Sequence, residues 1–470
     1  ERNLTYGKHF KCPGDQNDCD RGCEIRLVRL EGKNYPFGGA CNKYYNTRSH
    51  LSIDPSKTDY VQLRQRLVFE TYGQLTAPSE IEVTRPVVAM NHSFLLHTYF
   101  PLYSTFFDEL GFQVTVPEVP DERGIERARA GFCYPMQLAH GYFESIINMP
   151  RRPDIVFLPH LVSTPAIKDQ GTSSLCPLVQ SEPYVINSTF KFQIEALEKT
   201  GTQVLSPIIY MHSGLESVSQ PLVQMACDIG ISKKQAESAV KKAVAAQTNC
   251  FQQMRRVGLS VLKYLEEKPD KYAVTVFGRS YSAFSHDANM SVPLKFASRG
   301  VTVLPFDFLP QAEEISSENC YWATAQGTLA VAPFVSQHRQ LFPLWITHFS
   351  CGPDSFLIPQ FRQTMGNKPS LTLELDSHTA DAGIETRVEA FLDIVNAWRQ
   401  VNTPDQYLHI ENTADFTPAE VLFNRKDIMV KASSGEVLPI AHPRLTLLIP
   451  SLGRLSSPAF VASLKSVGIN

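Results

Sequence analysis

The chain has 470 residues, 43% of them hydrophobic and 19% charged, and a formal net charge of −3. A chain of this length and hydrophobic content can bury a large core divided over two to four domains. The near-neutral charge argues against nucleic acid and anionic membranes as partners, and no apolar run is long enough to span a membrane.

The N-terminal residues 1–50 are rich in Gly, Asn and Asp and contain one strand-like run, Glu24–Leu30. A segment with so little apolar periodicity cannot form its own core, so we expect a bound metal to hold it together. The cysteine spacing, C-x6-C-x3-C-x17-C, fits tetrahedral zinc and a closed iron–sulfur cluster equally well, with disulfides and free thiols as alternatives. The expected metal ligands are Cys12, Cys19, Cys23 and Cys41.

Residues 51–84 predict a polar connector with one helix at 59–73. From residue 85 onward, apolar strand-like runs alternate with helical stretches. PVVAMNHSF precedes a helix at 99–111, and PDIVFLP, YAVTVFG, GVTVLPF, LWITHFS and SLTLELD each precede another. This alternation is typical of parallel sheets with helices on both faces. We therefore expect an α/β fold with two lobes, at 85–230 and 271–443.

The Ala-rich and Lys-rich stretch within 231–270 predicts one long helix that bridges the two lobes. Its Cys250 and the preceding Cys227 are interpreted as buried small hydrophobic residues. Residues 444–470 predict a strand, RLTLLIP, followed by a helix, as at the start of a further α/β unit. Because the chain also begins with Glu1, we expect it to be a piece of a longer polypeptide, which a natural stop codon after residue 470 would refute.

Three further cysteines occupy turns that lead into predicted helices, each with a proline close behind: Cys133, Cys176 and Cys351. In open parallel sheets, ligands collect at such turns, where helix N-termini favour an anionic sulfur. Three matching positions suggest a shared ligand, and iron–sulfur clusters use thiolates almost exclusively. Three thiolates would leave one iron of a [4Fe–4S] cluster open for chemistry. The alternative is that these cysteines are buried and their prolines only shape turns.

Several segments together resemble a known family. ITHFSCGPDSF, KPSLTLELDSHTADAGIETRVEAFLD, YFPLYSTFFDELGFQVTV, CYPMQLAHGYFESI and FGRSYSAFSHDANM are similar to blocks of 2-hydroxyacyl-CoA dehydratases and of their activators, the acyl-CoA dehydratase activase-related proteins. These blocks span roughly residues 85–400. The resemblance implies Rossmann-like lobes with a [4Fe–4S] cluster, or a double-cubane cluster in some relatives, and a cysteine-rich block near the N-terminus in the large fused relatives.

The resemblance places the cluster ligands on Cys133, Cys176 and Cys351. A double cubane would need about six thiolates, and Cys320 is the only other cysteine at a suitable loop, so a single cubane is expected. The implied partners are an ATP-hydrolysing activator of the ASKHA type, fused or separate, and an acyl-CoA substrate. The chain has no G-x4-G-K-[ST] phosphate-binding loop of its own.

Two predicted loops should lie at the same sheet edge as the cysteines. They offer Arg279, Tyr281 and His286 after YAVTVFG, and Asp376, His378, Thr379 and Asp381 after LTLELD. We assign Arg279 and His378 as catalytic candidates that bind substrate or supply a proton, with hydrogen-bonded loop anchors as the alternative. His140 and Glu182 are candidates to support Cys133 and Cys176.

The sequence as a whole predicts a cytoplasmic iron–sulfur redox module. It would accept low-potential electrons from the activator and pass them to a substrate, with an acyl-CoA thioester as the class that the family implies. One alternative is a non-catalytic electron-transfer or scaffold segment of a larger protein. Another is a cysteine-nucleophile enzyme without a cluster. Clustered cysteines in a large α/β chain favour a reducing compartment over a disulfide framework.

Overall fold

The computed structural model divides the chain into two compact units, residues 1–398 and residues 399–470, which are described separately. It describes residues 4–469 except 14–22, 31, 38, 40–42, 49–51, 83, 129–130, 132, 168–170, 313–319, 402–418, 424–426, 448 and 450–455.

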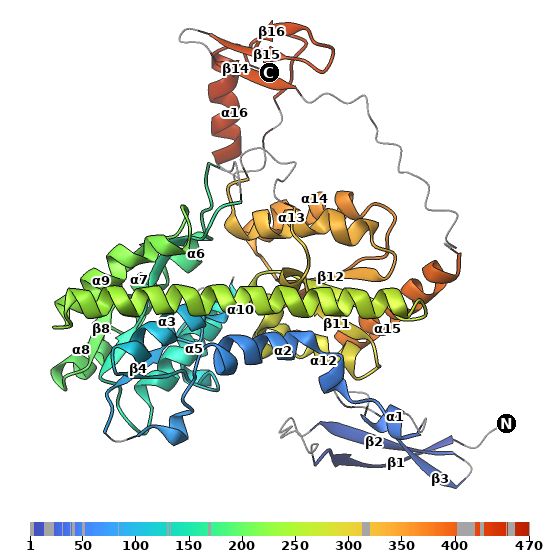
Figure 1. Ribbon diagram of the computed structural model, residues 1–470. Helices are drawn as coiled ribbons and strands as arrows, with labels where there is room; N and C mark the ends of the chain where they lie inside the picture. The colour runs from blue at the N-terminus through green and yellow to red at the C-terminus, as the bar shows by residue number, and fades with distance from the viewer. Residues whose placement is uncertain are drawn as a thin grey trace. The chain divides into compact units, whose positions relative to one another are not determined.

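The first of two four-stranded parallel sheets lies within the predicted first lobe (Figure 1). Its strands stand in the order β5 (Gln113–Thr115), β4 (Val87–Met90), β6 (Ile155–Phe157) and β8 (Gln203–Leu205). Successive side chains of a strand point to opposite faces. Val88 and Met90 accordingly pack in one apolar cluster with α3 (Leu96–Glu109), whereas Ala89 packs in another with α5 (Tyr134–Ile147). The predicted parallel sheet with helices on both faces is confirmed here.

The second parallel sheet repeats the same local strand order. Its strands are β11 (Thr302–Pro305), β10 (Ala273–Phe277), β12 (Leu341–His348) and β13 (Leu371–Leu375). Helices α12 (Val292–Ala297) and α15 (Asp381–Val401) cover one face, and α13 (Ala323–Gln337) and α14 (Gly352–Met365) cover the other. In both sheets the strand that comes first in the chain lies between the second and the third. Ligand sites of open α/β sheets form beside such a strand, where neighbouring loops diverge.

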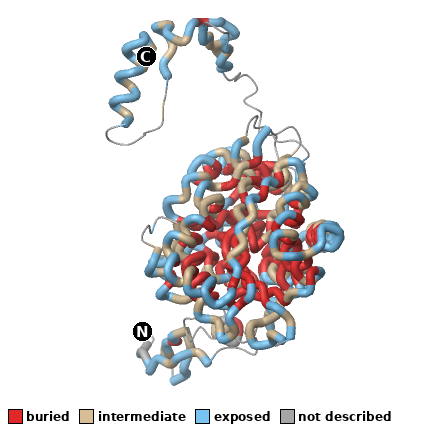
Figure 2. The backbone as a smooth tube through the Cα atoms, turned by 90° about the vertical axis from the view of Figure 1, so that its left-hand side faces the viewer, coloured by how far each residue is buried: buried red, intermediate tan, exposed pale blue. Residues whose placement is uncertain are grey.

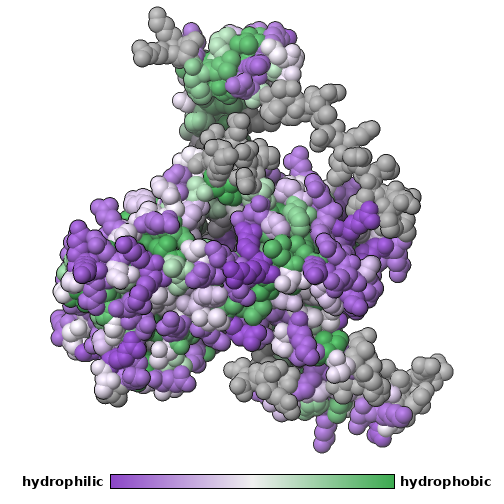
Figure 3. All heavy atoms as spheres, in the orientation of Figure 1, coloured by the Kyte–Doolittle hydropathy of each residue, from purple (hydrophilic) through white to green (hydrophobic). Residues whose placement is uncertain are grey.

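One long helix connects the two lobes. Helix α10 (Lys233–Glu267) begins where the Ser232 hydroxyl accepts from the Gln235 N–H at 3.3 Å, and it is rich in strong helix formers. It packs against α3, against α9 (Ser219–Asp228) and against η6 (Phe306–Phe308) (Figure 1). Its outer face in this view is mostly hydrophilic, with separate hydrophobic patches (Figure 3).

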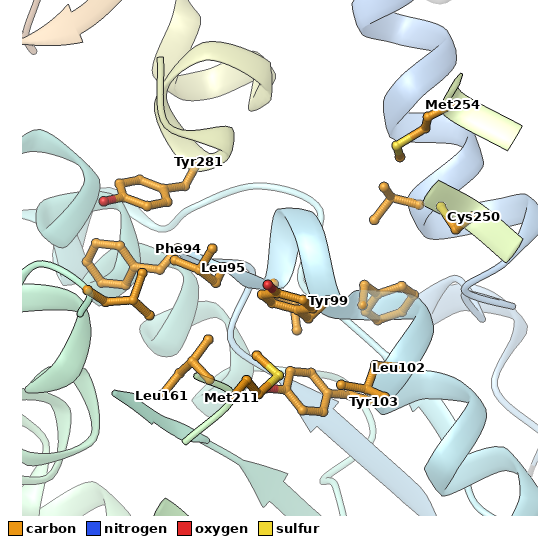
Figure 4. Close-up of a cluster of buried hydrophobic side chains, with 14 of the residues drawn as sticks. Phe94, Leu95, Tyr99, Leu102, Tyr103, Leu161, Met211, Cys250, Met254 and Tyr281 are labelled. Atoms are coloured by element: carbon orange, nitrogen blue, oxygen red, sulfur yellow. The ribbon is translucent and has the colours of Figure 1, made fainter. Parts of the chain in front are cut away.

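The core beneath α10 is continuous across both lobes, and buried residues fill the interior of the large unit (Figure 2). On α3, Tyr99 and Leu102 belong to the same apolar cluster as Cys250 and Met254 of α10, and Tyr103 lies beside Met211 (Figure 4). Cys250 is fully buried, as predicted, whereas Cys227 is only partly buried.

The remaining elements of the large unit are short. They are α4 (Glu122–Arg127), α6 (Pro177–Gln180), α7 (Glu182–Thr189), α8 (Lys191–Lys199) and α11 (His286–Asn289), together with a small parallel pair, β7 (His160–Ser163) and β9 (Ile208–Tyr210). Helix α2 (Tyr60–Arg66) follows its Asp59 cap and runs on into η2 (Leu67–Thr71), in agreement with the helix predicted at 59–73. Both elements bury apolar side chains in the core, so this stretch is less polar than predicted.

The N-terminal segment forms an antiparallel sheet of β1 (Leu4–Lys11), β2 (Glu24–Leu30) and β3 (Lys33–Phe37), followed by α1 (Lys43–Arg48). The predicted strand is β2, and the other two strands were not expected. The Cys12 N–H donates to the Cys23 carbonyl at 2.7 Å, and the Tyr44 hydroxyl donates to Cys12 Sγ at 3.3 Å. Cys19 and Cys41 lie outside the described residues, so the four-cysteine metal site stays a prediction.

The small C-terminal unit contains an antiparallel sheet of β14 (Glu420–Phe423), β15 (Ile428–Lys431) and β16 (Val437–Pro439), and helix α16 (Ser456–Ser466). The helix was predicted, but the strand at 444–450 was not found in its described part. The chain turns there, because the Leu445 N–H donates to the His442 carbonyl at 2.9 Å. Among all described residues, no helix has both the length and the apolarity that a membrane span requires.

Replacing Lys368 with methionine should lower the free energy of unfolding by about 2 kcal/mol. The buried ammonium of Lys368 donates to the carbonyls of Val335 (2.7 Å), Ser336 (3.3 Å) and His338 at the end of α13. Methionine would remove this donor from all three carbonyls, although the His338 carbonyl would still accept from the Leu341 N–H at 3.4 Å. Chemical denaturation measures the change. The exposed Lys271 is the control, and an equal loss in K271M would refute the capping role.

Candidate functional site

The three cysteines predicted to share a ligand line one cavity of about 330 Å³. Its wall is otherwise made of apolar and polar residues from both lobes: Pro135, Pro177, Leu178, Arg279, Trp322, His348, Phe349, Ser350, Gly352, Pro353 and Phe356. Phe349 and Phe356 are 63% and 71% exposed, so this wall includes two rings that are largely open to solvent.

Each cysteine is the residue at which a helix begins. Cys133 precedes α5, Cys176 precedes α6 and Cys351 precedes α14, and each helix has a proline in its first turn. Proline fits there because the first N–H groups of a helix have no partner within it. In all three cases the cysteine carbonyl accepts the first helical hydrogen bond, and the side chain makes no capping bond. Backbone hydrogen bonds from Met136 to Cys133 and from Asp354 to Cys351 lower the pKa values of these two thiols and so favour their anionic form.

The second sheet positions two of the functional groups. Arg279 follows β10 and Cys351 follows β12, and these strands are parallel neighbours, so both residues lie at their carboxyl ends. Gly278 permits the turn to Arg279, because a Cβ atom there would lie 2.4 Å from the Ile346 carbonyl oxygen and its φ is +136°. Ser350 has a left-handed φ of 62°, a conformation that non-glycine residues adopt at an energetic cost. This strained turn places Cys351 at the start of α14.

Arg279 is held by a buried ion pair. Its Nη2 lies 2.9 Å from Asp354 Oδ2, and the side chains are only 5% and 3% exposed. Asp354 also accepts from the Thr347 hydroxyl, and the guanidinium carbon lies 5.3 Å from the centre of the Tyr281 ring. Arg279 Nε is buried and has no hydrogen-bond partner in the part of the chain that the structure describes. Arg279 is thus a buried cation in the wall of the cavity, and its Nε–H group can still donate a hydrogen bond to a ligand.

His348 is the second polar group with unused hydrogen-bonding capacity. It is 2% exposed, its ring stacks on Tyr134 with centroids 5.4 Å apart, and neither ring nitrogen has a hydrogen-bond partner among the described residues. Burial, followed by the nearby charge of Arg279, lowers the pKa of His348 to about 3, so the ring is neutral. Buried polar groups nearly always find a partner in folded proteins, so a ligand or ordered water is expected beside this ring.

The thiols themselves are in an apolar environment. Burial raises the pKa of Cys133 and raises that of Cys351 to about 12, although the positive charge of Arg279 acts in the opposite direction for both. Without a bound cation these thiols are therefore protonated near neutral pH. Among the described residues, no three His, Cys, Asp or Glu side chains are arranged to hold a single metal ion.

Residues 87–309 match the family model described as CoA enzyme activase uncharacterised domain (DUF2229). Over these residues the chain belongs to an acyl-CoA dehydratase activase-related family. The expected resemblance is thereby confirmed at the level of the family. A comparison with curated proteins yields no match. The activase-related region includes Cys133, Cys176 and Arg279, whereas His348 and Cys351 lie beyond its end.

Only some of the other predicted site residues of this activase-related chain lie at the cysteine cavity. Arg279 lines the cavity, and the ring of Tyr281 lies against the Arg279 guanidinium. His286 and His378 are not among the residues that line the cavity. The side chain of His378 is 89% exposed, and the backbone N–H of His378 donates to Asp376 Oδ1 at 2.9 Å within the same turn. The geometry does not bring His378 to the cysteines, and its predicted catalytic role remains untested.

The candidates for a supporting role also lie outside the wall of the cavity. His140 is buried, with its Nδ1 2.7 Å from the Met136 carbonyl oxygen. Glu182 is buried behind α6. An isolated bridge pairs Ser174 with Trp322 in parallel. In this pairing Cys320 lies beside the chain four residues before Cys176, so the two cysteines are not opposite each other. A fourth thiolate from Cys320 is therefore not supported.

Sequence reasoning missed His348, Asp354 and Trp322. His348 lies three residues before Cys351 at a strand end, and Asp354 lies three residues after it in the first turn of α14. This symmetric placement around a candidate ligand was a usable signal. No such signal pointed to Trp322, because Trp322 is brought to the cavity by a bridge between two loops that are distant in sequence.

Proposed function

We propose that the cavity holds one [4Fe–4S] cluster on Cys133, Cys176 and Cys351 and that the chain is an iron–sulfur redox module. The observation that carries the proposal is the convergence of three thiols, each free of capping bonds at a helix start, on one cavity. When bound, such a group supplies one-electron redox chemistry. Three protein thiolates leave one coordination position for a further ligand.

The unpaired donors in the wall support this assignment. Arg279 Nε and the neutral ring of His348 would donate to sulfur, and donors to cluster sulfurs are among the groups that set a reduction potential. Metal-bound histidines usually donate their second ring nitrogen to a protein acceptor. His348 has no such acceptor, which favours a hydrogen-bonding role over ligation. The charge of Arg279 would also compensate for the negative thiolates.

The substrate and the partner follow from the family. An acyl-CoA thioester is the proposed substrate class, and an ATP-hydrolysing activator is the proposed electron donor. The exposed rings of Phe349 and Phe356 in the wall of the cavity offer apolar surface that either could cover. Arg279 is proposed to contact the substrate or the cluster, and no role in proton transfer is assigned to it.

The alternatives make different predictions. A cysteine-nucleophile enzyme needs an activated thiolate, whereas burial raises the pKa of Cys133 and Cys351. A scaffold segment needs no redox centre, so it would show no reducible signal in any preparation.

Electron paramagnetic resonance of anaerobically reconstituted protein tests the proposal. Addition of a low-potential one-electron donor should produce a signal from a reduced cluster in the wild type. The signal of the cavity should be absent after substitution of all three cavity cysteines by serine, while any signal from the N-terminal cysteines remains. The same reducible signal in the triple variant would refute the assignment, and its absence from both proteins would favour the scaffold alternative.

A further inference from the structure

Behind α6 lies a buried acid that the proposed function does not use. Glu182 is 8% exposed at the first residue of α7. Its Oε1 accepts from Asn91 Nδ2 at 2.8 Å and from the hydroxyl of Ser93. Among the described residues, no Lys, Arg or His forms an ion pair with Glu182. A buried carboxylate without a cation is costly, whereas a neutral carboxylic acid in the same place is not.

A small cavity adjoins this acid at the carboxyl ends of β4 and β6. Its volume is about 20 Å³, and its polar lining includes Asn91, Ser93, Tyr103 and Glu182. The Tyr103 hydroxyl and Asn91 Oδ1 are buried, and no described residue forms a hydrogen bond with either atom. A single water needs roughly 10–15 Å³ of such space and two to four polar neighbours. Figure 4 shows Tyr103 with Phe94, Leu95 and Leu161, which supply part of the apolar lining of the same cavity.

We propose that this cavity binds one water molecule and that Glu182, hydrogen-bonded to that water, is a proton-holding site whose occupancy responds to charge in the cysteine cavity. Because Oε1 already accepts two hydrogen bonds, the proton resides on Oε2. The proton exchanges with solvent through the water. No other covalent step is involved.

The surroundings of Glu182 explain its proton affinity. Burial raises its pKa to about 7, and only the neutral donors Ser93 and Asn91 act in the opposite direction. Of the titratable groups on α3 and α5, Tyr103 lines the same cavity as Glu182, and His140 follows Ala139, whose carbonyl accepts from Asn91. Burial raises the pKa of Tyr103 and lowers that of His140. Both are neutral near pH 7, and neither compensates a charge on Glu182.

The short helix α6 separates the two cavities. Cys176, Pro177 and Leu178 line the cysteine cavity, whereas Val179 and Glu182 line the small one. Six helical residues span roughly 9 Å, so one negative charge at Cys176 should raise the pKa of Glu182 by about one unit. Under the proposed function, which this part of the inference rests on, that charge is the electron taken up in the cysteine cavity.

Infrared difference spectroscopy between pH 5 and pH 9 tests the site without requiring iron. The wild type should show a protonated carboxylic acid band that titrates near pH 7, and E182Q should lack it. Y103F, which removes one water partner and keeps the acid, should retain the band at a shifted frequency. An unchanged set of carboxylic acid bands in E182Q would overturn the proposal.

The response to charge is tested by alkylating Cys176 with iodoacetate, which adds a carboxylate, and with iodoacetamide, which adds a neutral amide of similar size. Mass spectrometry confirms the modified residue. The Glu182 midpoint should lie about one pH unit higher with the charged adduct. Equal midpoints for the two adducts would refute the coupling. Neither the infrared titration nor the alkylation experiment requires iron. Both results can therefore be interpreted even if the cysteine cavity holds no cluster.

Discussion

Replacing Arg279 with methionine is expected to lower the free energy of unfolding by about 3–5 kcal/mol. The substitution removes the only ion-pair partner that the described residues give Asp354, which is 2% exposed. Thr347 alone would then hydrogen-bond a buried carboxylate. Chemical denaturation of R279M and of the wild type, both prepared without added iron, measures the change apart from any contribution of a bound cluster.

Two variants separate charge burial from loss of packing. The double variant R279M/D354L removes both charges and should recover most of the loss, because a buried ion pair can often be replaced by apolar residues. Arg85 is the control, because its side chain and that of its partner Asp108 are each 39% exposed. R85M should cost about 1 kcal/mol or less. Equal losses in R279M and R85M would contradict a special role for the buried pair.

Replacing Gly258 with alanine should cost about 3 kcal/mol, because the new Cβ atom would lie 2.0 Å from the Phe308 carbonyl oxygen. Gly258 lies where α10 packs against η6, so the clash would move the second lobe relative to the helix that connects the lobes. The cysteine cavity takes its wall from both lobes, and G258A should therefore bind iron more weakly as well as unfold more easily.

Gly327 is the control for this substitution. It also lies inside a helix, α13, but a Cβ atom there would meet only a Phe306 ring carbon at 3.9 Å. G327A should therefore stabilise the protein by up to about 1 kcal/mol, the gain expected from helix propensity alone. Thermal or chemical denaturation of both variants measures the difference. A G258A protein as stable as G327A would show that the contact between α10 and η6 is looser than described.

Local patterns predicted the parallel sheets because their strands are continuous apolar runs buried on both faces. The run at Ala273–Phe277 and the run at Leu341–His348 are fully buried and were visible as such. The antiparallel strands β1 and β3 were missed because their mostly exposed residues carry little apolar pattern. Strands β14, β15 and β16 are apolar but only three or four residues long, and they do not fit the alternation of strands and helices on which the prediction was based. The β14–β16 sheet instead depends on pairing between neighbouring segments.

The cysteines of the candidate site were found because each precedes a proline that fits the first turn of a helix. Their convergence was inferred from topology alone, and they do line one cavity. The partners that complete the site were not predictable in the same way. Arg279 and Asp354 are 75 residues apart, and only the pairing of β10 with β12 brings them together. His378 does not line this cavity, because a position at a strand end of the same sheet does not by itself direct a side chain into it, and its catalytic role stays a prediction.

Iron and acid-labile sulfide, determined on anaerobically purified protein, test the central claim most directly. The comparison is between the wild type, the serine variant of Cys133, Cys176 and Cys351, and a control serine variant of Cys227 and Cys320, which do not line the cavity. The account predicts a loss of about four iron and four sulfide per chain in the first variant and none in the control. Equal contents in all three proteins, or no iron in any of them after reconstitution, would contradict it.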